Sequence, residues 1–269
     1  MFFFANSAFP VPCTQPVQHE EHLEKFVPYM QDARAQLDHA RRVKGALYKH
    51  PPESREFWRK LAVEAYQAVR VFHPEDRAIS TEASFRAGEL LRAGGRDAEA
   101  LQEFLWASTR RAGAFSTRAR LEIGHLHRRN EEDRKALDAY LDVAADARAD
   151  AAHRDDAWIW AGQIWKRGKR IEDARRAWKR VAEGGRDPLD RIRAFDLLGV
   201  LWFEEDDLEA ACGVLNQCLQ SLSEAALEET RSGERVRNAL LRMRLVDALP
   251  RAIASRKNSG EKTGSSRNP

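Results

Sequence analysis

Apolar residues recur along the chain at the three- and four-residue spacing of helices, and few segments alternate between apolar and polar residues. The first spacing is typical of an amphipathic helix, whereas strict alternation would predict a strand. Ala, Leu, Arg and Glu dominate and β-branched residues are scarce, which also favours helix. The pattern therefore predicts an all-α chain of about ten to eleven helices.

A glycine recurs in equivalent helical settings, at intervals of 36, 38 and 37 residues. The four copies are Gly88, Gly124, Gly162 and Gly199. Alanine follows each glycine after twelve residues, and a bulky residue follows it after sixteen. These bulky residues are Phe104, Tyr140, Trp178 and Leu215. Such a period indicates stacked helical hairpins, each of which buries its apolar face only against its neighbours.

A pair of residues suited to ending a helix and reversing the chain lies between the two helices of each hairpin. These pairs are Gly94-Gly95, Asn130-Glu131, Gly168-Lys169 and Glu205-Asp206. Glycine inside a helix costs about 1 kcal/mol relative to alanine, so a glycine repeated at one position has to be offset by close packing. We therefore expect the helices of each hairpin to approach closely at the repeated glycine.

The pattern resembles the tetratricopeptide repeat (TPR) superfamily, and the chain looks like a bacterial TPR-like protein. The third copy fits best, because Trp158, Trp165 and Trp178 occupy the large positions of the motif around Gly162. We expect these three tryptophans to lie in the core. His127 departs from the motif by replacing an aromatic residue. The resemblance implies an α-solenoid of stacked hairpins that winds into a right-handed superhelix.

The repeat divides the chain into five parts. Residues 1–19 are expected to be extended or disordered, and residues 20–78 to form an atypical amino-terminal helical cap. Four TPR-like units should occupy residues 79–224. Residues 225–253 are expected to form a carboxy-terminal capping helix, because a terminal repeat has to shield the last core face. Residues 254–269, rich in Ser, Gly, Asn and Lys, are expected to be disordered.

The charge of the chain argues against a general nucleic-acid binder. Lys and Arg number 45 and Asp and Glu number 42, but the last fourteen residues hold four of the former and one of the latter. The remaining body is neutral, with 41 of each, and generates no general field that would steer nucleic acid. No run of apolar residues is long enough to span a membrane. We predict a cytoplasmic location, with a periplasmic or envelope-associated one as the alternative.

No motif for nucleophilic catalysis or phosphate binding is present, so we predict a non-enzymatic protein without a cofactor. Metal binding is not expected either. His125 and His127 are two residues apart on a predicted helix, so they point about 200° apart and cannot share a metal ion.

The resemblance implies a partner-binding groove lined by the first helix of each hairpin. The positions that would face a ligand include Phe85, Arg86, Leu121, Glu122, His125, Ile159, Trp160, Gln163, Leu197 and Val200. The apolar members suit a helix or an extended peptide anchored by an aromatic residue. The Lys and Asn pattern that clamps chaperone carboxyl termini is absent. We therefore predict a scaffold that binds a protein or peptide of unknown identity.

Several alternatives remain open at this stage. The groove could be covered by the amino-terminal segment or by a second copy of the chain, which leaves a monomer and a homodimer both possible. A basic rim at the hairpin turns could instead bind nucleic acid or an acidic partner, although local acidic residues favour a solvated edge. The rim consists of Arg128, Arg129, Lys166, Arg167, Lys169 and Arg170. A further alternative is a cell-envelope assembly or accessory factor.

Overall fold

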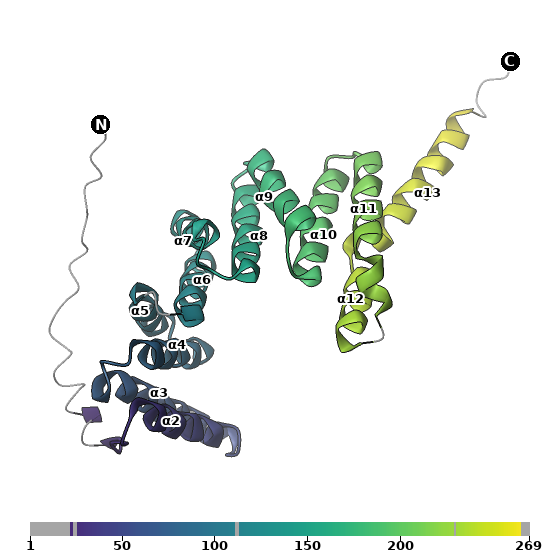
Figure 1. The fold of residues 1–269 in the computed structure, drawn as a ribbon. Coiled ribbons are helices and arrows are strands. Elements are labelled where there is room, and N and C mark those ends of the chain that lie inside the picture. Colours follow the sequence, from purple (N-terminus) through teal and green to yellow (C-terminus); the bar gives the residue numbers. More distant parts are fainter. Residues whose placement is uncertain (1–21, 24–25, 111–112, 229, 265–269) are drawn as a thin grey trace, which may run out of the picture. The chain divides into compact units, whose positions relative to one another are not determined.

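The computed structural model describes residues 22–23, 26–110, 113–228 and 230–264, with side chains as far as Ser255. Within these residues every regular element is a helix (Figure 1). The elements are α2 (Ala33–Leu47), the 3-10 helix η1 (Pro52–Ser54), α3 (Arg55–Phe72), α4 (Arg77–Ala93), α5 (Asp97–Thr109), α6 (Gly113–Arg129), α7 (Asp133–Ala145), α8 (Ala151–Arg167), α9 (Ile171–Gly184), α10 (Pro188–Glu204), α11 (Leu208–Leu227), α12 (Arg231–Leu241) and α13 (Arg244–Gly264). The predicted all-α solenoid of hairpins is confirmed.

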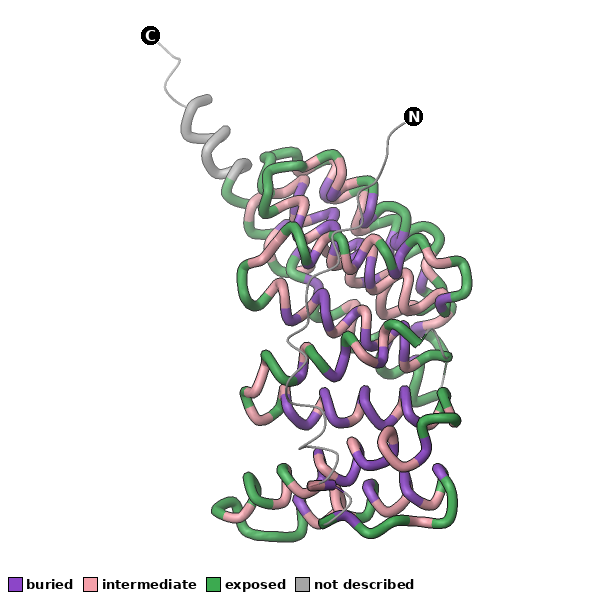
Figure 2. Tube along the Cα trace, turned by 90° about the vertical axis from the view of Figure 1, so that its left-hand side faces the viewer, coloured by how far each residue is buried: buried purple, intermediate pink, exposed green. Residues whose placement is uncertain are grey.

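The chain divides into two compact units, Met1–Glu122 and Ile123–Pro269, with the boundary inside α6. The predicted repeats are four hairpins, which we number 1 to 4: α4 with α5, α6 with α7, α8 with α9, and α10 with α11. In the first unit α3 packs on α4, and in the second α9 packs on α10, whereas α13 packs on α10 and α11. Buried residues recur along the helices, and the turns between helices are largely exposed (Figure 2).

Aspartate side chains cap the amino-terminal ends of several helices. Asp76 accepts a hydrogen bond from the backbone N–H of Ile79 at the start of α4, at 3.0 Å. Asp187 accepts one from Leu189 at the start of α10, at 2.8 Å, and Pro188 occupies the first helical position. Such caps satisfy backbone donors that the first turn of a helix leaves unpaired.

All four hairpin turns have the same hydrogen-bonded geometry. In the first turn, the N–H of Arg96 donates to the carbonyl of Leu91 at 2.9 Å, and Gly95 donates to Arg92 at 3.0 Å. This is a Schellman motif, which requires a left-handed residue after the helix. The left-handed residues are Gly95, Glu131, Lys169 and Asp206, with φ of +76°, 60°, 60° and 63°. The turns therefore lie where the sequence predicts them.

The repeated glycines let the two helices of hairpins 1 to 3 approach closely. A Cβ at Gly88 would lie 2.6 Å from the ring of Phe104, and one at Gly124 would lie 2.6 Å from the ring of Tyr140. At Gly162 it would collide with the indole of Trp178. The glycine and the aromatic residue sixteen positions later are thus contacting partners.

Hairpin 4 departs from this rule. A Cβ at Gly199 would collide with Leu245 of α13, and Leu215 is not among its three nearest contacts. Leu245 is fully buried and packs with Ala211 and Leu249, whereas Leu215 lies at the edge of the same cluster. Leucine is shorter than the aromatic residues of the other hairpins, so a side chain from the capping helix fills the space beside the glycine.

The two ends of the repeat compare differently with the prediction. At the amino-terminal end, α2 and α3 precede hairpin 1, and the break at Pro51 and Pro52 contains only η1. Residues 1–19 lie outside the described residues. At the carboxy-terminal end, the single helix expected over residues 225–253 is wrong, because two helices are present.

Two breaks interrupt the expected helix. At the first, Thr230 caps α12 by accepting from the N–H of Gly233 at 3.1 Å, and at the second, only Arg242 and Met243 separate α12 from α13. The expectation of disorder from residue 254 is also wrong for residues 254–264, which continue α13. Composition does not explain this extension, since Ser, Gly, Asn and Thr outnumber Ala, Arg, Lys and Glu between residues 254 and 264. None of the described helices is long and apolar enough to cross a membrane.

Candidate functional site

The predicted groove positions separate into a buried row and half-exposed rows. Phe85, Leu121 and Ile159 are 0%, 5% and 0% exposed, which corrects the prediction that they face a partner. Each lies three residues before a repeated glycine, so it points only about 60° from that glycine around the helix. The glycine faces the neighbouring helix, and the residue three positions before it is therefore core.

The positions two before and one after each glycine point farther from the core and are half-exposed. They include Arg86, Glu122, His125, Trp160, Gln163, Leu197 and Val200. Of these, Leu197 and Val200 also pack on the edges of buried clusters. These two rows are the part of the predicted groove that a partner could contact.

In the amino-terminal unit the half-exposed rows are occupied by ion pairs. Arg86 pairs with Glu89 at 2.8 Å, and Arg92 of α4 pairs with Glu122 of α6 at 2.5 Å. Arg118 lies 4.4 Å from the centre of the Phe85 ring and covers this buried aromatic residue. Because these charges satisfy one another, this face of the unit mainly links adjacent helices.

In the carboxy-terminal unit the same rows carry Trp160, a half-exposed indole on α8. The guanidinium carbons of Arg128 and Arg193 lie 4.4 and 4.6 Å from the centre of its ring. His125 meets it edge-on at 5.2 Å between ring centres. Each exposed cation–π contact contributes about 0.5–1 kcal/mol, so the indole is held in one orientation by cations from hairpins 2 and 4.

Further contacts fix the surroundings of the indole. His125 Nδ1 lies 2.7 Å from the hydroxyl of the buried Tyr140, whose ring is stacked on Trp160 with centres 6.4 Å apart. Asp156, four residues before Trp160 on α8, pairs with Arg193 at 3.2 Å. Burial raises the pKa of Asp156, while the charge of Arg193 acts in the opposite direction. Trp160 is therefore a rigid aromatic surface at the edge of a charged network.

Of the other tryptophans of α8 and α9, Trp178 lies deeper than Trp160, whereas Trp158 and Trp165 are half-buried like Trp160. Trp178 is fully buried and donates its indole N–H to the carbonyl of Ile159 at 3.1 Å, as expected for a core residue. Trp158 and Trp165 are half-buried and pack against the same cluster, with ring centres 6.3 Å apart. They lie at the margin of the core rather than in its interior, because their half-buried rings retain contact with solvent.

Three of the six residues of the predicted basic rim are paired with acids. Lys166 pairs with Glu204 at 2.5 Å, Arg167 pairs with Asp133, and Arg170 pairs with Asp173 at 2.6 Å. Arg128 instead covers Trp160. Arg129 and Lys169 are exposed. The acids on the neighbouring helices thus neutralise much of the charge that suggested an anion-binding edge.

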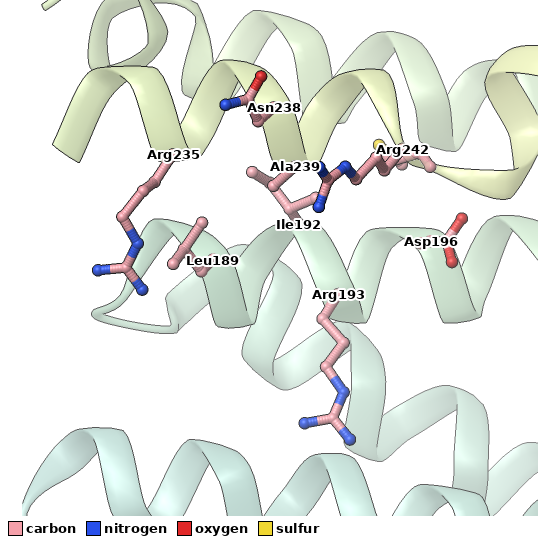
Figure 3. A pocket seen from close by; sticks show the side chains of 9 residues that line it. Leu189, Ile192, Arg193, Asp196, Arg235, Asn238, Ala239 and Arg242 are labelled. Atoms are coloured by element: carbon pink, nitrogen blue, oxygen red, sulfur yellow. The ribbon is translucent and has the colours of Figure 1, made fainter. Parts of the chain in front are cut away.

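A pocket of about 450 Å³ lies between α10 and α12. Leu189, Ile192, Ala239 and Met243 form its apolar part, and Arg193, Asp196, Arg235, Asn238 and Arg242 supply polar groups. Arg235 extends from α12, Arg242 from the residue that follows α12, and Arg193 from α10 (Figure 3). Arg193, which lines the pocket, is also the side chain that lies over the Trp160 ring.

Sequence reasoning did not identify Arg235 and Arg242 as site residues. The two are seven positions apart, which places them on one face of a helix, and this spacing is visible in the sequence. That face could not be oriented without knowing that residues 231–241 pack on α10 as a separate helix.

Comparisons with known proteins agree with the fold. TPR-like repeats of a kinesin light chain from Podosopora anserina superpose with a TM-score of 0.51 at 14% identity, covering 74% of this chain and 100% of that one. PilF from Pseudomonas aeruginosa superposes with a TM-score of 0.50 at 16% identity, covering 77% and 82%. No family model and no curated protein matches the sequence. The chain thus has a TPR-like fold, in the class of helical repeat proteins.

Proposed function

We propose that the chain is a non-enzymatic interaction scaffold, which binds a segment of a partner protein on the carboxy-terminal unit. The observation that carries this proposal is the half-exposed indole of Trp160, held between Arg128 and Arg193. A rigid aromatic residue loses little conformational freedom when it is covered, and such residues often dominate binding energy. The TPR-like fold supports the proposal, since it displays a row of first helices to a partner.

The proposal is tested by replacing Trp160 with alanine and comparing proteins captured from native cells by the two baits. We expect at least one protein that the unmodified chain retains to be lost from Trp160→Ala. Truncating a central aromatic residue of an interface typically weakens binding by about 2 kcal/mol or more. Circular dichroism has to show unchanged helicity, because the indole also links neighbouring hairpins.

Trp106→Ala provides a matched control in the amino-terminal unit. Trp106 is also half-exposed and also lies under two guanidinium groups, those of Arg70 and Arg110, at 5.0 and 4.3 Å. It differs in lying on α5, a second helix of a hairpin, outside the predicted groove rows. Capture of the same proteins by Trp160→Ala and Trp106→Ala would overturn the proposal.

The alternative of nucleic-acid or acidic-partner binding through the rim receives less support. Lys166, Arg167 and Arg170 each have a carboxylate partner. A ligand could bind these three side chains only if their ion pairs were broken. The cytoplasmic location stays a prediction from the sequence.

A further inference from the structure

We infer that the pocket between α10 and α12 binds an acidic segment of the partner, placing a carboxylate near Arg235 and Arg242 and an apolar side chain against Ile192. This inference rests on the proposed function and specifies the chemistry of the ligand. It assigns a role to α12, which the repeat pattern does not include.

The charges around the pocket are the first argument. Asp196 is engaged by Arg244, which donates to it from its backbone N–H and from its Nε, both at 2.8 Å. By contrast, the exposed guanidinium groups of Arg235 and Arg242 form no ion pair with any residue that the structure describes. An anionic group of a ligand could therefore neutralise these two guanidinium groups. A guanidinium binds a carboxylate through two parallel hydrogen bonds, and this gives it a strong preference for that group.

The floor of the pocket is the second argument. Ile192 and Met243 are 4% and 3% exposed and belong to the buried cluster of the unit, and Ala239 and Leu189 pack beside them. These residues give the cations an apolar surface, on which one aliphatic or aromatic side chain can be buried. An anion with no apolar group would leave this apolar surface exposed to water.

Continuity with Trp160 is the third argument. Arg193 lines the pocket and also lies over the indole ring, so the two features share one side chain. A peptide that crosses α10 could therefore contact the pocket and Trp160 together. A nucleic acid requires a longer track of unpaired cations, whereas Lys166, Arg167 and Arg170 of the rim are each paired with a carboxylate.

The test begins with the full chain and a display library of random peptides about twelve residues long. We expect enriched sequences to combine Asp or Glu with a neighbouring apolar residue. The absence of such enrichment overturns the inference. A selected peptide, and its version with Asn and Gln in place of Asp and Glu, then serve as fluorescent probes for anisotropy measurements.

The double variant Arg235→Gln, Arg242→Gln should bind the acidic probe at least about tenfold more weakly and lose most of the salt dependence. The control Arg134→Gln, Arg251→Gln removes two exposed arginines of the same unit outside the pocket and should bind as the unmodified chain does. Equal affinity of the two double variants overturns the inference.

The remaining outcomes separate the inference from the proposed function. Binding that is weakened by Trp160→Ala and unaffected by the pocket variant overturns only the inference. A probe that is indifferent to both overturns both proposals. If oligothymidylate binds more tightly than the acidic peptide, and the pocket variant loses this binding, the ligand of the pocket is a nucleic acid. If the unmodified chain is a dimer and the pocket variant is a monomer, the pocket binds a second copy of the chain. Each of these two results overturns the inference.

Discussion

At the scale of single residues, hairpins 1 to 3 each pack a glycine of the first helix against an aromatic ring of the second. Gly162 faces the indole of Trp178, and Gly88 and Gly124 face the rings of Phe104 and Tyr140. The aromatic ring occupies the volume that a side chain at the glycine would need. The energetic cost of glycine in a helix is therefore offset by burial of a large ring.

Replacing Gly162 with alanine should destabilise the fold by about 1–3 kcal/mol, because the new methyl group collides with Trp178 in a packed core. Urea denaturation followed by circular dichroism measures the change. The control is Gly184→Ala at the end of α9, where a Cβ would meet nothing within 4 Å. A loss of stability in the control as large as that in Gly162→Ala would contradict the packing argument.

Asp190 illustrates how burial and like charges act on one residue. Burial and the negative charges of Asp156 and Asp187 raise its pKa to about 6, above the ordinary value of 3.8. A raised pKa means that the folded state favours the protonated carboxyl. The stability that this group contributes is present at low pH and is lost as the pH rises through about 6.

Asp190→Asn should therefore be more stable than the unmodified chain at about pH 7.5, by about 1–2 kcal/mol after allowance for partial solvent screening. The difference should shrink as the pH falls toward about 4.5, where the carboxyl is protonated. Thermal unfolding at several pH values measures it. The exposed Asp138→Asn on α7 is the control, and an equal gain there would refute the assignment.

At the scale of the element, the hairpin turns are defined by backbone conformation more than by side chains. Gly95 adopts its left-handed conformation without strain, whereas Glu131, Lys169 and Asp206 carry a Cβ in the same conformation. The hydrogen bonds of the motif hold these residues in place, as shown by Arg170 donating to the carbonyl of Trp165 at 2.8 Å.

Lys169→Gly should raise the free energy of unfolding by about 0.5–1 kcal/mol, because glycine relieves the left-handed strain at a modest entropic cost. Chemical denaturation measures the gain. Lys179→Gly, an exposed lysine inside α9, should instead lower stability by about 1 kcal/mol. If Lys169→Gly destabilises the chain as much as Lys179→Gly does, the left-handed conformation of Lys169 is not strained.

At the scale of the whole molecule, stability in a repeat chain is nearly a sum of nearest-neighbour contacts. Leu245 of α13 closes hairpin 4 by filling the space at Gly199. The carboxy-terminal unit therefore depends on a residue outside the four repeats.

Leu245→Ala should destabilise the carboxy-terminal unit by about 2–5 kcal/mol, since it opens a cavity beside Gly199 and Ala211. Hydrogen exchange should accelerate in α10 and α11 and stay unchanged in α4 and α5, which belong to the other unit. Leu241→Ala, at a position 71% exposed, is the control. Equal acceleration in both units would show that they unfold as one.

Local periodicity determined the helices of the four hairpins, their turn positions and the first three glycine–aromatic pairs, because these follow from short-range backbone geometry and from a repeated spacing. The buried row of Phe85 and Ile159 could also have been recognised from its small angle to the glycine. Only the tertiary structure decided the partners of charged and capping side chains. Packing of segments distant in sequence set Arg193 over Trp160 and Leu245 against Gly199, and it left Arg235 and Arg242 beside an apolar pocket.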